Sequence, residues 1–446
     1  MRHDPEFLLE CVLLRIKSKS TYDHLRSNNI LPLSSPQTIR RLLSCMPCKF
    51  GLNSFALSSI KTFLSGKPKK LCYGSLVWDE MSIAGDVSFD PMQLVFEGFV
   101  DYGESDGFSE PITLKKHEGE LADHALVLIF RPYRYLWIQP IACYATKGAC
   151  PGGVIHQLMA RALIVLHQQV AVVKSVVCDG AQTNKTVMRL CGINGKYSSI
   201  DNTFNGTPNV HQDTVTAPAS CDVDERSNNE KTSFDHPTLD ESLIYFMVDV
   251  PHLLKTIRNN IFTVKDVQFK DTNGTEEMVS LINDAIDVMN GRCFQKSIRR
   301  TSWKKSRQTL ESLLETLWET ELACDATNVK PFASQTTLEA LRVTVFSTIE
   351  LTEHLFSSEI NYEFRFFKIV HQAGGGTEMP TVHSFLALFR MLCVYYPTKA
   401  TIAHSNVEEE RMSLLTSYKD CMLHRSKKGP EGSKGQKASA KGQTCK

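Results

Sequence analysis

Two aspartates at the ends of apolar segments are the residues of this sequence best suited to chemistry. Asp79 lies in LCYGSLVWDEMSI and Asp179 lies in VVKSVVCDGAQTN, and in each case polar or turn-forming residues follow at once. Two carboxylates on neighbouring strands can share a pair of divalent metal ions, which suits hydrolysis and phosphoryl transfer. If the two strands are neighbours, we expect a nucleic-acid-cutting site that holds Mg²⁺ or Mn²⁺.

The composition is that of a globular protein with a local concentration of positive charge. The 446 residues carry a net charge of +1, and 42% of them are hydrophobic, which allows two to four domains. Residues 292–307 contain seven basic residues and no acid, so we expect them to contact a polyanion or to form a solvated helix face. The candidate DNA contacts in this segment are Arg299, Arg300, Trp303 and Lys304.

The cysteines and the apolar segments limit where the protein works. The 14 cysteines have no regular spacing, no N-terminal segment resembles a signal peptide, and no apolar run is long enough to span a bilayer. We therefore expect reduced thiols in a nuclear or cytoplasmic protein that is neither secreted nor membrane-bound.

The N-terminal residues 1–66 have helical patterns. In LPLSSPQTIRRLLSCM, Ser35 is a good N-cap and Pro36 suits the first helical position. Thr38, Arg40 and Arg41 then lie in the first turns, where a helix-turn-helix presents side chains to DNA. A plain helical packing module is an equally good interpretation.

From residue 71 the pattern changes to strands. LCYGSLVWDEMSI, LVFEGFVDYG and ALVLIFRPYRYLWIQPIACYAT predict three strands, followed by a helix, the strand AVVKSVVCDG and a second helix. This order matches an RNase H-like α/β core, with Asp79 on the first strand and Asp179 at the end of the fourth. Residues 195–238 are polar and predict a loop or disordered insertion, and the basic tail 425–446 predicts disorder.

Several segments together resemble the P-element transposase family, which includes THAP-type relatives. They include WDEMSI, VVCDGAQTNKTVMRLCGI, FMVDVPHLLKTIRNN and PFASQTTLEALRVTVFSTIELTEHL, in the order of the family. The zinc-binding THAP module that usually begins its members has no matching spacing of cysteines here. The resemblance implies an N-terminal helix-turn-helix segment, an RNase H-like core, an all-helical GTP-binding insertion and a return to the core. We place these parts at 1–66, 70–258, 259–345 and 346–420.

The resemblance also assigns catalytic residues. The family's first acid lies in its Asp-Glu-Met-x-Ile motif, here Asp79, and its second lies in its Asp-Gly-Ala motif, here Asp179. The third acid, a Glu, precedes a Phe-Phe pair by two residues, and that position is Phe364 in this sequence. Glu363 is the nearest acid, and it is our candidate for the third catalytic residue and metal ligand.

GTP is the second cofactor that the resemblance implies. The sequence contains no G-x-x-x-x-G-K-[ST] motif, so a P-loop is excluded. Asp249, His252, Lys255 and Asn259 recur at steps of three and four residues and so share one helix face. They are the candidate nucleotide contacts, and a polar face packed against the core is the alternative interpretation.

These expectations lead to two hypotheses. The first is a DNA transposase that cuts and joins transposon ends and target DNA with two metal ions, uses GTP and works as a homo-oligomer. The second is a domesticated or decayed relative of the same fold that binds DNA or nucleotide without cutting. The two hypotheses differ in whether Glu363 can take the place of the family's third catalytic acid.

Overall fold

The computed structural model divides the chain into two compact units, residues 1–47 with 401–446, and residues 48–400. The structure describes residues 5–44, 49–90, 95–103, 117, 119–135, 137–195, 231–263, 273–289, 298–357, 382, 385–386 and 389–393. Within these ranges no helix is both long and apolar enough to cross a bilayer.

The described part of the first unit contains three short helices, α1 (Pro5–Lys17), α2 (Lys19–Ser27) and α3 (Pro36–Ser44). The buried Tyr22 of α2 donates a hydrogen bond of 2.8 Å to the carbonyl of Ser34, which fixes the connection to α3. Ser35 accepts a hydrogen bond from the backbone N–H of Thr38 at 3.0 Å. The sequence therefore predicted the N-cap of α3 correctly, because a serine oxygen satisfies an otherwise free N–H of the first turn.

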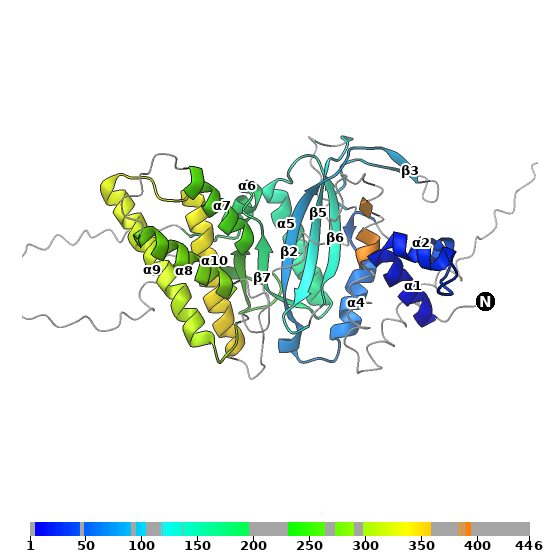
Figure 1. Ribbon diagram of the computed structural model, residues 1–446, viewed down its shortest axis with the longest axis horizontal. Helices are drawn as coiled ribbons and strands as arrows, with labels where there is room; N and C mark the ends of the chain where they lie inside the picture. Colours follow the sequence, from blue (N-terminus) through cyan, green and yellow to red (C-terminus); the bar gives the residue numbers. More distant parts are fainter. Residues whose placement is uncertain are drawn as a thin grey trace, which may run out of the picture. The chain divides into compact units, whose positions relative to one another are not determined.

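A seven-stranded mixed sheet forms the centre of the second unit (Figure 1). Across the sheet the strands are β1 (Gly51–Leu52), β6 (Gln139–Thr146), β5 (His124–Pro132), β2 (Tyr73–Ser82), β7 (Val172–Cys178), β9 (Leu243–Val248) and β8 (Ser233–Asp235). β2 runs parallel to β7 and β7 runs parallel to β9, whereas the other pairs are antiparallel. The five central strands thus have the mixed order of an RNase H-like sheet, as predicted.

The structure corrects two of the three predicted N-terminal strands. The run LVFEGFVDYG supplies only β4 (Val95–Glu97), which pairs with β3 (Ser88–Asp90) in a separate hairpin. Gly98 ends this run with φ of +129°, and a Cβ there would lie 2.1 Å from the carbonyl oxygen of Asp86. The run 125–146 instead divides into β5 and β6 at the turn after Pro132, a turn signal that the apolar pattern obscured.

The N-terminal boundary also differs from the prediction. Residues 49–66 are not part of the N-terminal helical unit, because β1 joins the edge of the sheet at β6 and α4 (Ser54–Leu64) packs against β6. Asn53 caps α4 by accepting the backbone N–H of Ala56 at 2.9 Å. The short η1 (Lys69–Cys72) then leads into β2.

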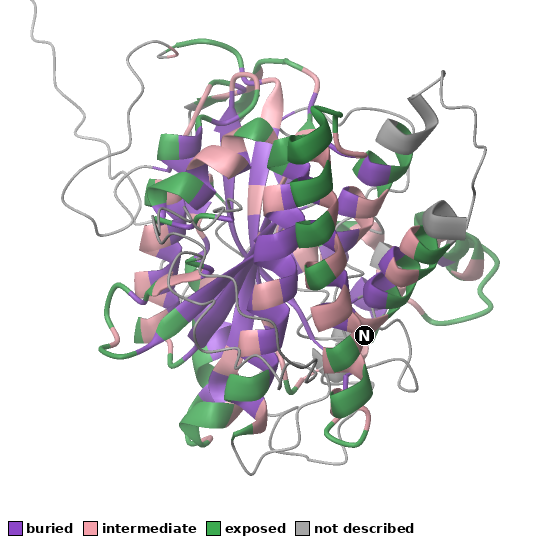
Figure 2. Ribbon diagram, turned by 90° about the vertical axis from the view of Figure 1, so that its left-hand side faces the viewer, coloured by how far each residue is buried: buried purple, intermediate pink, exposed green. Residues whose placement is uncertain are grey.

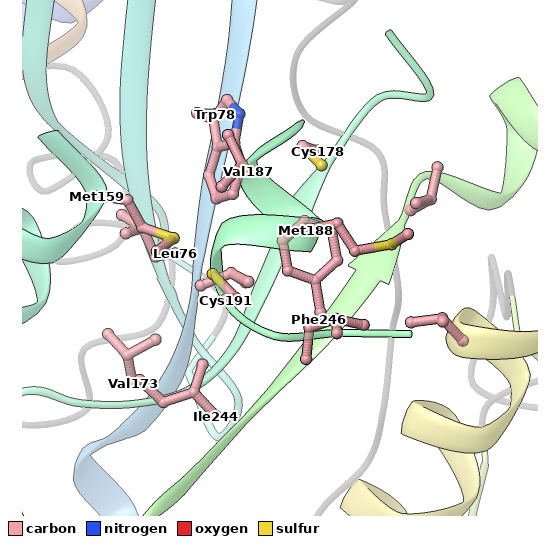
Figure 3. Close-up of a cluster of buried hydrophobic side chains, with 14 of the residues drawn as sticks. Leu76, Trp78, Met159, Val173, Cys178, Val187, Met188, Cys191, Ile244 and Phe246 are labelled. Carbon is pink, nitrogen blue, oxygen red and sulfur yellow. The ribbon is translucent and has the colours of Figure 1, made fainter. Parts of the chain in front are cut away.

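Helices α5 (Gly152–Gln168) and α6 (Gln182–Leu190) cover one face of the central strands. Their apolar side chains meet those of the sheet in a continuous core, part of which Figure 3 shows: Leu76 and Trp78 from β2, Met159 from α5, Val187 and Met188 from α6, and Phe246 from β9. Figure 2 shows the strands mostly buried, whereas the helices are buried along one side. β7 is buried at every position, as expected for a parallel strand covered on both faces.

A layer of four helices lies on the β7 side of the sheet (Figure 1): α7 (Val250–Thr263), α8 (Asn273–Met289), α9 (Trp303–Thr327) and α10 (Gln335–Phe356). Leu351 and Leu355 of α10 pack against Val177, Tyr245 and Met247. Within the layer, Arg342 of α10 forms a buried ion pair with Glu321 of α9 and donates to the carbonyl of Gly195 at 2.9 Å.

The expected helical insertion 259–345 begins inside α7 and ends inside α10, so both of these boundaries fall within continuous helices. Of the predicted loop 195–238, residues 233–235 form the edge strand β8, and 196–230 lie outside the described residues. In the return segment 346–420, the described residues between 382 and 393 pack against Ala125, Cys143 and Ala145 of the sheet. The tail 425–446 lies outside the described residues.

Close packing of α5 on α6 predicts that two adjacent glycines respond differently to alanine. A Cβ at Gly152 would lie 2.5 Å from the carbonyl oxygen of Thr183, whereas a Cβ at Gly153 would meet nothing within 4 Å. We expect Gly152→Ala to lower the free energy of unfolding by about 1–3 kcal/mol. Gly153→Ala, the matched control, should change it by at most about 1 kcal/mol. Urea denaturation measures both, and equal stabilities would contradict the packing described.

Candidate metal-binding edge of the sheet

Asp79, in the last part of β2, and Asp179, directly after β7, lie side by side on two adjacent parallel strands. Val77 of β2 is paired with Val177 of β7, and each aspartate lies two residues further along its strand. Neighbouring strands are about 4.8 Å apart, so the two carboxylates start from neighbouring backbone positions. The pair that the sequence singled out is therefore brought together by the register of β2 on β7.

A short hydrogen-bond network orients Asp179. Its Oδ1 accepts the backbone N–H of Ala181 at 2.9 Å and the side-chain amide of Asn184 at 2.6 Å. The carbonyl of the Asn184 side chain in turn accepts the indole N–H of Trp78 at 2.9 Å. Because Oδ2 of Asp179 has no hydrogen-bond partner among the described residues, this oxygen can face a metal ion while Oδ1 holds the carboxylate in place.

Asp79 is half-buried, and its Oδ1 accepts the backbone N–H of Glu80 at 2.8 Å. Strand alternation sets Asp79 on the face opposite to its buried neighbour Trp78. The Asp79 carboxylate therefore points away from the core cluster around Trp78, and the residue is partly exposed to solvent.

Glu80 is a third acid at this edge that sequence reasoning left out. Its Oε1 accepts the backbone N–H of Cys150 at 2.7 Å, just before α5. Burial raises the pKa of the Glu80 carboxyl, and the negative charges of Asp179 and Asp79 raise it further, against the opposing effects of the Cys150 N–H and His124. Its position directly after Asp79 in WDEMSI was the one sequence signal that could have identified Glu80 as part of this edge.

Asp249 and His252, which we assigned to nucleotide binding, lie at the same edge of the sheet. Cys178 is paired with Val248, so Asp249 follows β9 where Asp179 follows β7, and its backbone N–H donates to the carbonyl of Cys178 at 2.8 Å. The Asp249 carboxylate lies 2.7 Å from Nδ1 of His252. The periodicity of a helix face had suggested a separate site, because the sequence does not show where β9 ends.

Lys255 and Asn259 continue the same face of α7 and are exposed. The four candidate nucleotide contacts therefore run from the strand edge along the helix, with the acid and the histidine at one end and the amine and the amide at the other.

The donor set at the edge suits a hard cation. Asp79 and Asp179 offer carboxylate oxygens, the ligands that Mg²⁺ and Mn²⁺ prefer. In the described part of the chain, no group of three or more His, Cys, Asp and Glu side chains gathers into a metal-binding cluster. Glu363, the candidate third ligand, lies outside the described residues.

The candidate DNA contacts lie on two different units. In the first unit, Arg40 and Arg41 are exposed on α3 and Thr38 is half-buried near its start. In the second unit, Arg300 and Lys304 are exposed close to the start of α9.

The ring of Trp303 packs inward against Phe356 at 6.0 Å, edge to face, within the core between α10 and the sheet. Trp303, one of the candidate DNA contacts, therefore has its ring packed inside the unit. Arg299 lies half-buried beside it.

The strand order defines the class of the second unit as an RNase H-like fold. Residues 48–192 match the family model "TNP-like, RNase H N-terminal domain". The chain is also similar in structure to the solved Drosophila P element transposase strand transfer complex, with a TM-score of 0.60 and 16% sequence identity over 92% of this chain and 94% of that chain. No curated protein sequence matches the chain. The two matches confirm the resemblance to P-element transposases at the level of the fold.

The raised pKa of Glu80 predicts a pH-dependent difference between the wild type and Glu80→Gln. Because the native state holds the Glu80 proton more tightly than the unfolded chain does, wild-type stability falls as pH rises from the ordinary value of 4.5 through the raised pKa. The glutamine carbonyl still accepts the Cys150 N–H but carries no charge. Urea denaturation between about pH 4 and about pH 8 should show the variant gaining stability relative to the wild type as pH rises. Glu315→Gln on the exposed face of α9 should show no such trend, and a pH-independent difference for Glu80→Gln would contradict the burial described.

Proposed function

We propose that the protein is a DNA transposase of the P-element type that cleaves and transfers DNA strands at the edge formed by β2, β7 and β9. The observation that carries this proposal is the register that aligns Asp79 with Asp179 on parallel strands. The fold shared with the Drosophila P element transposase supports it.

Asp79 and Asp179 are the residues that would hold Mg²⁺ or Mn²⁺. When bound, a pair of such ions supplies an activated nucleophile and stabilises the leaving oxygen of an in-line displacement. Asn184 acts as a positioning residue, since it fixes one oxygen of Asp179 and is itself fixed by Trp78. Glu363 is our proposed third ligand, on the resemblance alone.

DNA is the proposed substrate, both as transposon ends and as target. Arg40 and Arg41 on α3, together with Thr38, are proposed contacts in the N-terminal unit, and Arg299, Arg300 and Lys304 are proposed contacts near the start of α9. Of these residues, Arg40, Arg41, Arg300 and Lys304 are exposed, and exposed cations contact phosphates and set the salt dependence of binding. Assembly as a homo-oligomer and action in the nucleus belong to the same proposal.

Asp79→Ala provides the direct test of strand cleavage. We expect purified wild-type protein to nick a duplex carrying the element's terminal repeat when Mg²⁺ or Mn²⁺ is present, and the variant to lose this activity because one metal ligand is gone. Asp284→Ala removes an exposed carboxylate on α8 and is the matched control, which should cut as the wild type does.

Two results would count against strand cleavage at this site. Equal nicking by the wild type and Asp79→Ala would place the chemistry elsewhere. Wild-type protein that binds the duplex without nicking it in either metal would instead identify a domesticated, non-catalytic DNA-binding protein of the same fold.

We also propose that GTP is a cofactor and that it contacts Lys255 and Asn259 on the exposed face of α7. Because Asp249 and His252 are paired with each other beside Asp179, they are better placed to influence the metal-binding edge than to form a separate nucleotide pocket. An ammonium group can neutralise phosphate charge, whereas a carboxylate repels it.

Paired alanine variants separate these two roles. Lys255→Ala is expected to weaken GTP binding about tenfold, the usual consequence of losing one charge-assisted hydrogen bond, and to leave nicking without GTP unchanged. Asp249→Ala should reduce nicking and retain GTP affinity. Titration with a fluorescent GTP analogue measures the affinities, and equal GTP binding by the wild type and Lys255→Ala would remove this lysine from the site.

A further inference from the structure

A buried lysine lies near the amino end of β7, at the opposite end of the strand from Asp179. Lys174 is only 5% exposed, and its ammonium group donates to the hydroxyl of Ser242 at 2.9 Å and lies 5.3 Å from the centre of the Tyr73 ring. Figure 3 shows Val173, which precedes Lys174, and Ile244, which lies two residues after Ser242, at the end of the core cluster away from Trp78 and Cys178.

The surroundings of Lys174 are positively charged. In the part of the chain that the structure describes, no carboxylate lies within ion-pair distance of its ammonium group. Burial lowers the pKa of Lys174, and the charge of Lys69 on η1 lowers it further. The nearest acids in sequence to its partner Ser242 are Asp240 and Glu241, which are both exposed in the turn before β9.

His236, in the connection between β8 and β9, adds an unused donor to this cluster. Its Nδ1 accepts the backbone N–H of Thr238 at 3.2 Å, so the proton of the neutral ring is on Nε2. Nε2 is buried, since His236 is only 5% exposed, and it has no hydrogen-bond partner among the described residues.

The ring of His236 is neutral at physiological pH. Burial lowers its pKa to about 4, and the positive charges of His167, Lys174 and Lys69 contribute to the shift. The ring of His167 lies 5.5 Å away. Ser242 holds Lys174 and His236 close together, because its hydroxyl accepts the ammonium group of Lys174 and its carbonyl accepts the backbone N–H of His236 at 2.8 Å. A buried donor without a partner, such as Nε2 of His236, calls for an ion or a water.

We propose that Lys174, His236 and Lys69 form a binding site for a small oxyanion of the phosphate class. Lys174 contributes a charged donor and Nε2 of His236 contributes a neutral one. Lys69, exposed on η1, contributes a second positive charge that acts on both residues. The ligand must be small, because the two inner residues are too buried for the backbone of a duplex to reach them. The site is separate from the proposed catalytic edge and independent of the proposed transposase activity.

A bound anion here would join three parts of the chain. It would connect η1, the start of β7 and the connection between β8 and β9, which are distant in sequence. Binding only to the native state would stabilise the fold by mass action. The chemistry fits both free phosphate and a phosphomonoester.

The test uses the full-length protein and titrates it with sodium phosphate or glycerol phosphate in a calorimeter, with ionic strength held constant by sodium chloride. We expect saturable binding to the wild type that weakens at least about tenfold in Lys174→Met and in Lys69→Ser. Lys61→Ser, at an exposed position of α4, is the matched control and should bind as the wild type does. Tighter binding of glycerol phosphate would assign an ester, and equal or weaker binding would assign the free ion.

Lys174→Met removes a buried charge and keeps the aliphatic chain, whereas Lys69→Ser changes an exposed side chain. If one of the two variants fails to fold, the other still tests the site. Absence of phosphate binding to the wild type would overturn the proposal and leave a water molecule as the partner of His236. Unchanged affinity in both variants would overturn it equally, as would displacement of phosphate by a short DNA duplex.

Discussion

The parallel pairing of β2 with β7 is the interaction on which the rest of the second unit depends. β7 is buried on both faces, so a slip of one residue would turn its side chains from one packed layer into the other. The register that satisfies both layers aligns Val77 with Val177. The same register brings Asp79 beside Asp179, and the pairing of β7 with β9 brings Asp249 to the other side of Asp179. Hydrophobic packing thus sets the geometry of the polar edge, which has little attraction of its own to hold it together.

A single side chain joins the packed core to this edge. Asn184 receives the indole N–H of the buried Trp78 and donates to the carboxylate of Asp179. Because a buried indole N–H needs an acceptor, the orientation of the asparagine is determined by the core, and its amide group then determines the orientation of the acid. The segment before the amino end of α5 makes a related contact, in which Glu80 accepts the N–H of Cys150. Asp79 and Glu80, which are adjacent in sequence, lie on opposite faces of the sheet because side chains alternate along β2.

The sequence predicted the RNase H-like strand order and the two aspartates, because apolar strands and their polar ends are local patterns. It also predicted the N-cap of α3, which depends on one serine. It misplaced one strand, since LVFEGFVDYG has the composition of a strand but is broken at Gly98 by a backbone angle that only the fold reveals. It also treated β5 and β6 as one run. The position of Asp249 was missed for a different reason. The residues that share its helix face can be recognised in the sequence. Asp179, its neighbour across the sheet, is 70 residues away in the chain, and only the pairing of β7 with β9 shows that the two are close.

The hydroxyl groups of α10 have a consequence for how copies of the chain can associate. Beyond the short β8, strand β9 would present free N–H groups at the edge of the sheet, and such an edge can pair with a strand from another molecule. The N–H of Val248 instead donates to Thr344 of α10 at 3.0 Å, and the N–H of Phe246 donates to the carbonyl of Thr232. The helix thereby closes this part of the edge to strand addition. Association of several copies would have to use side-chain surfaces there and not an extension of the sheet.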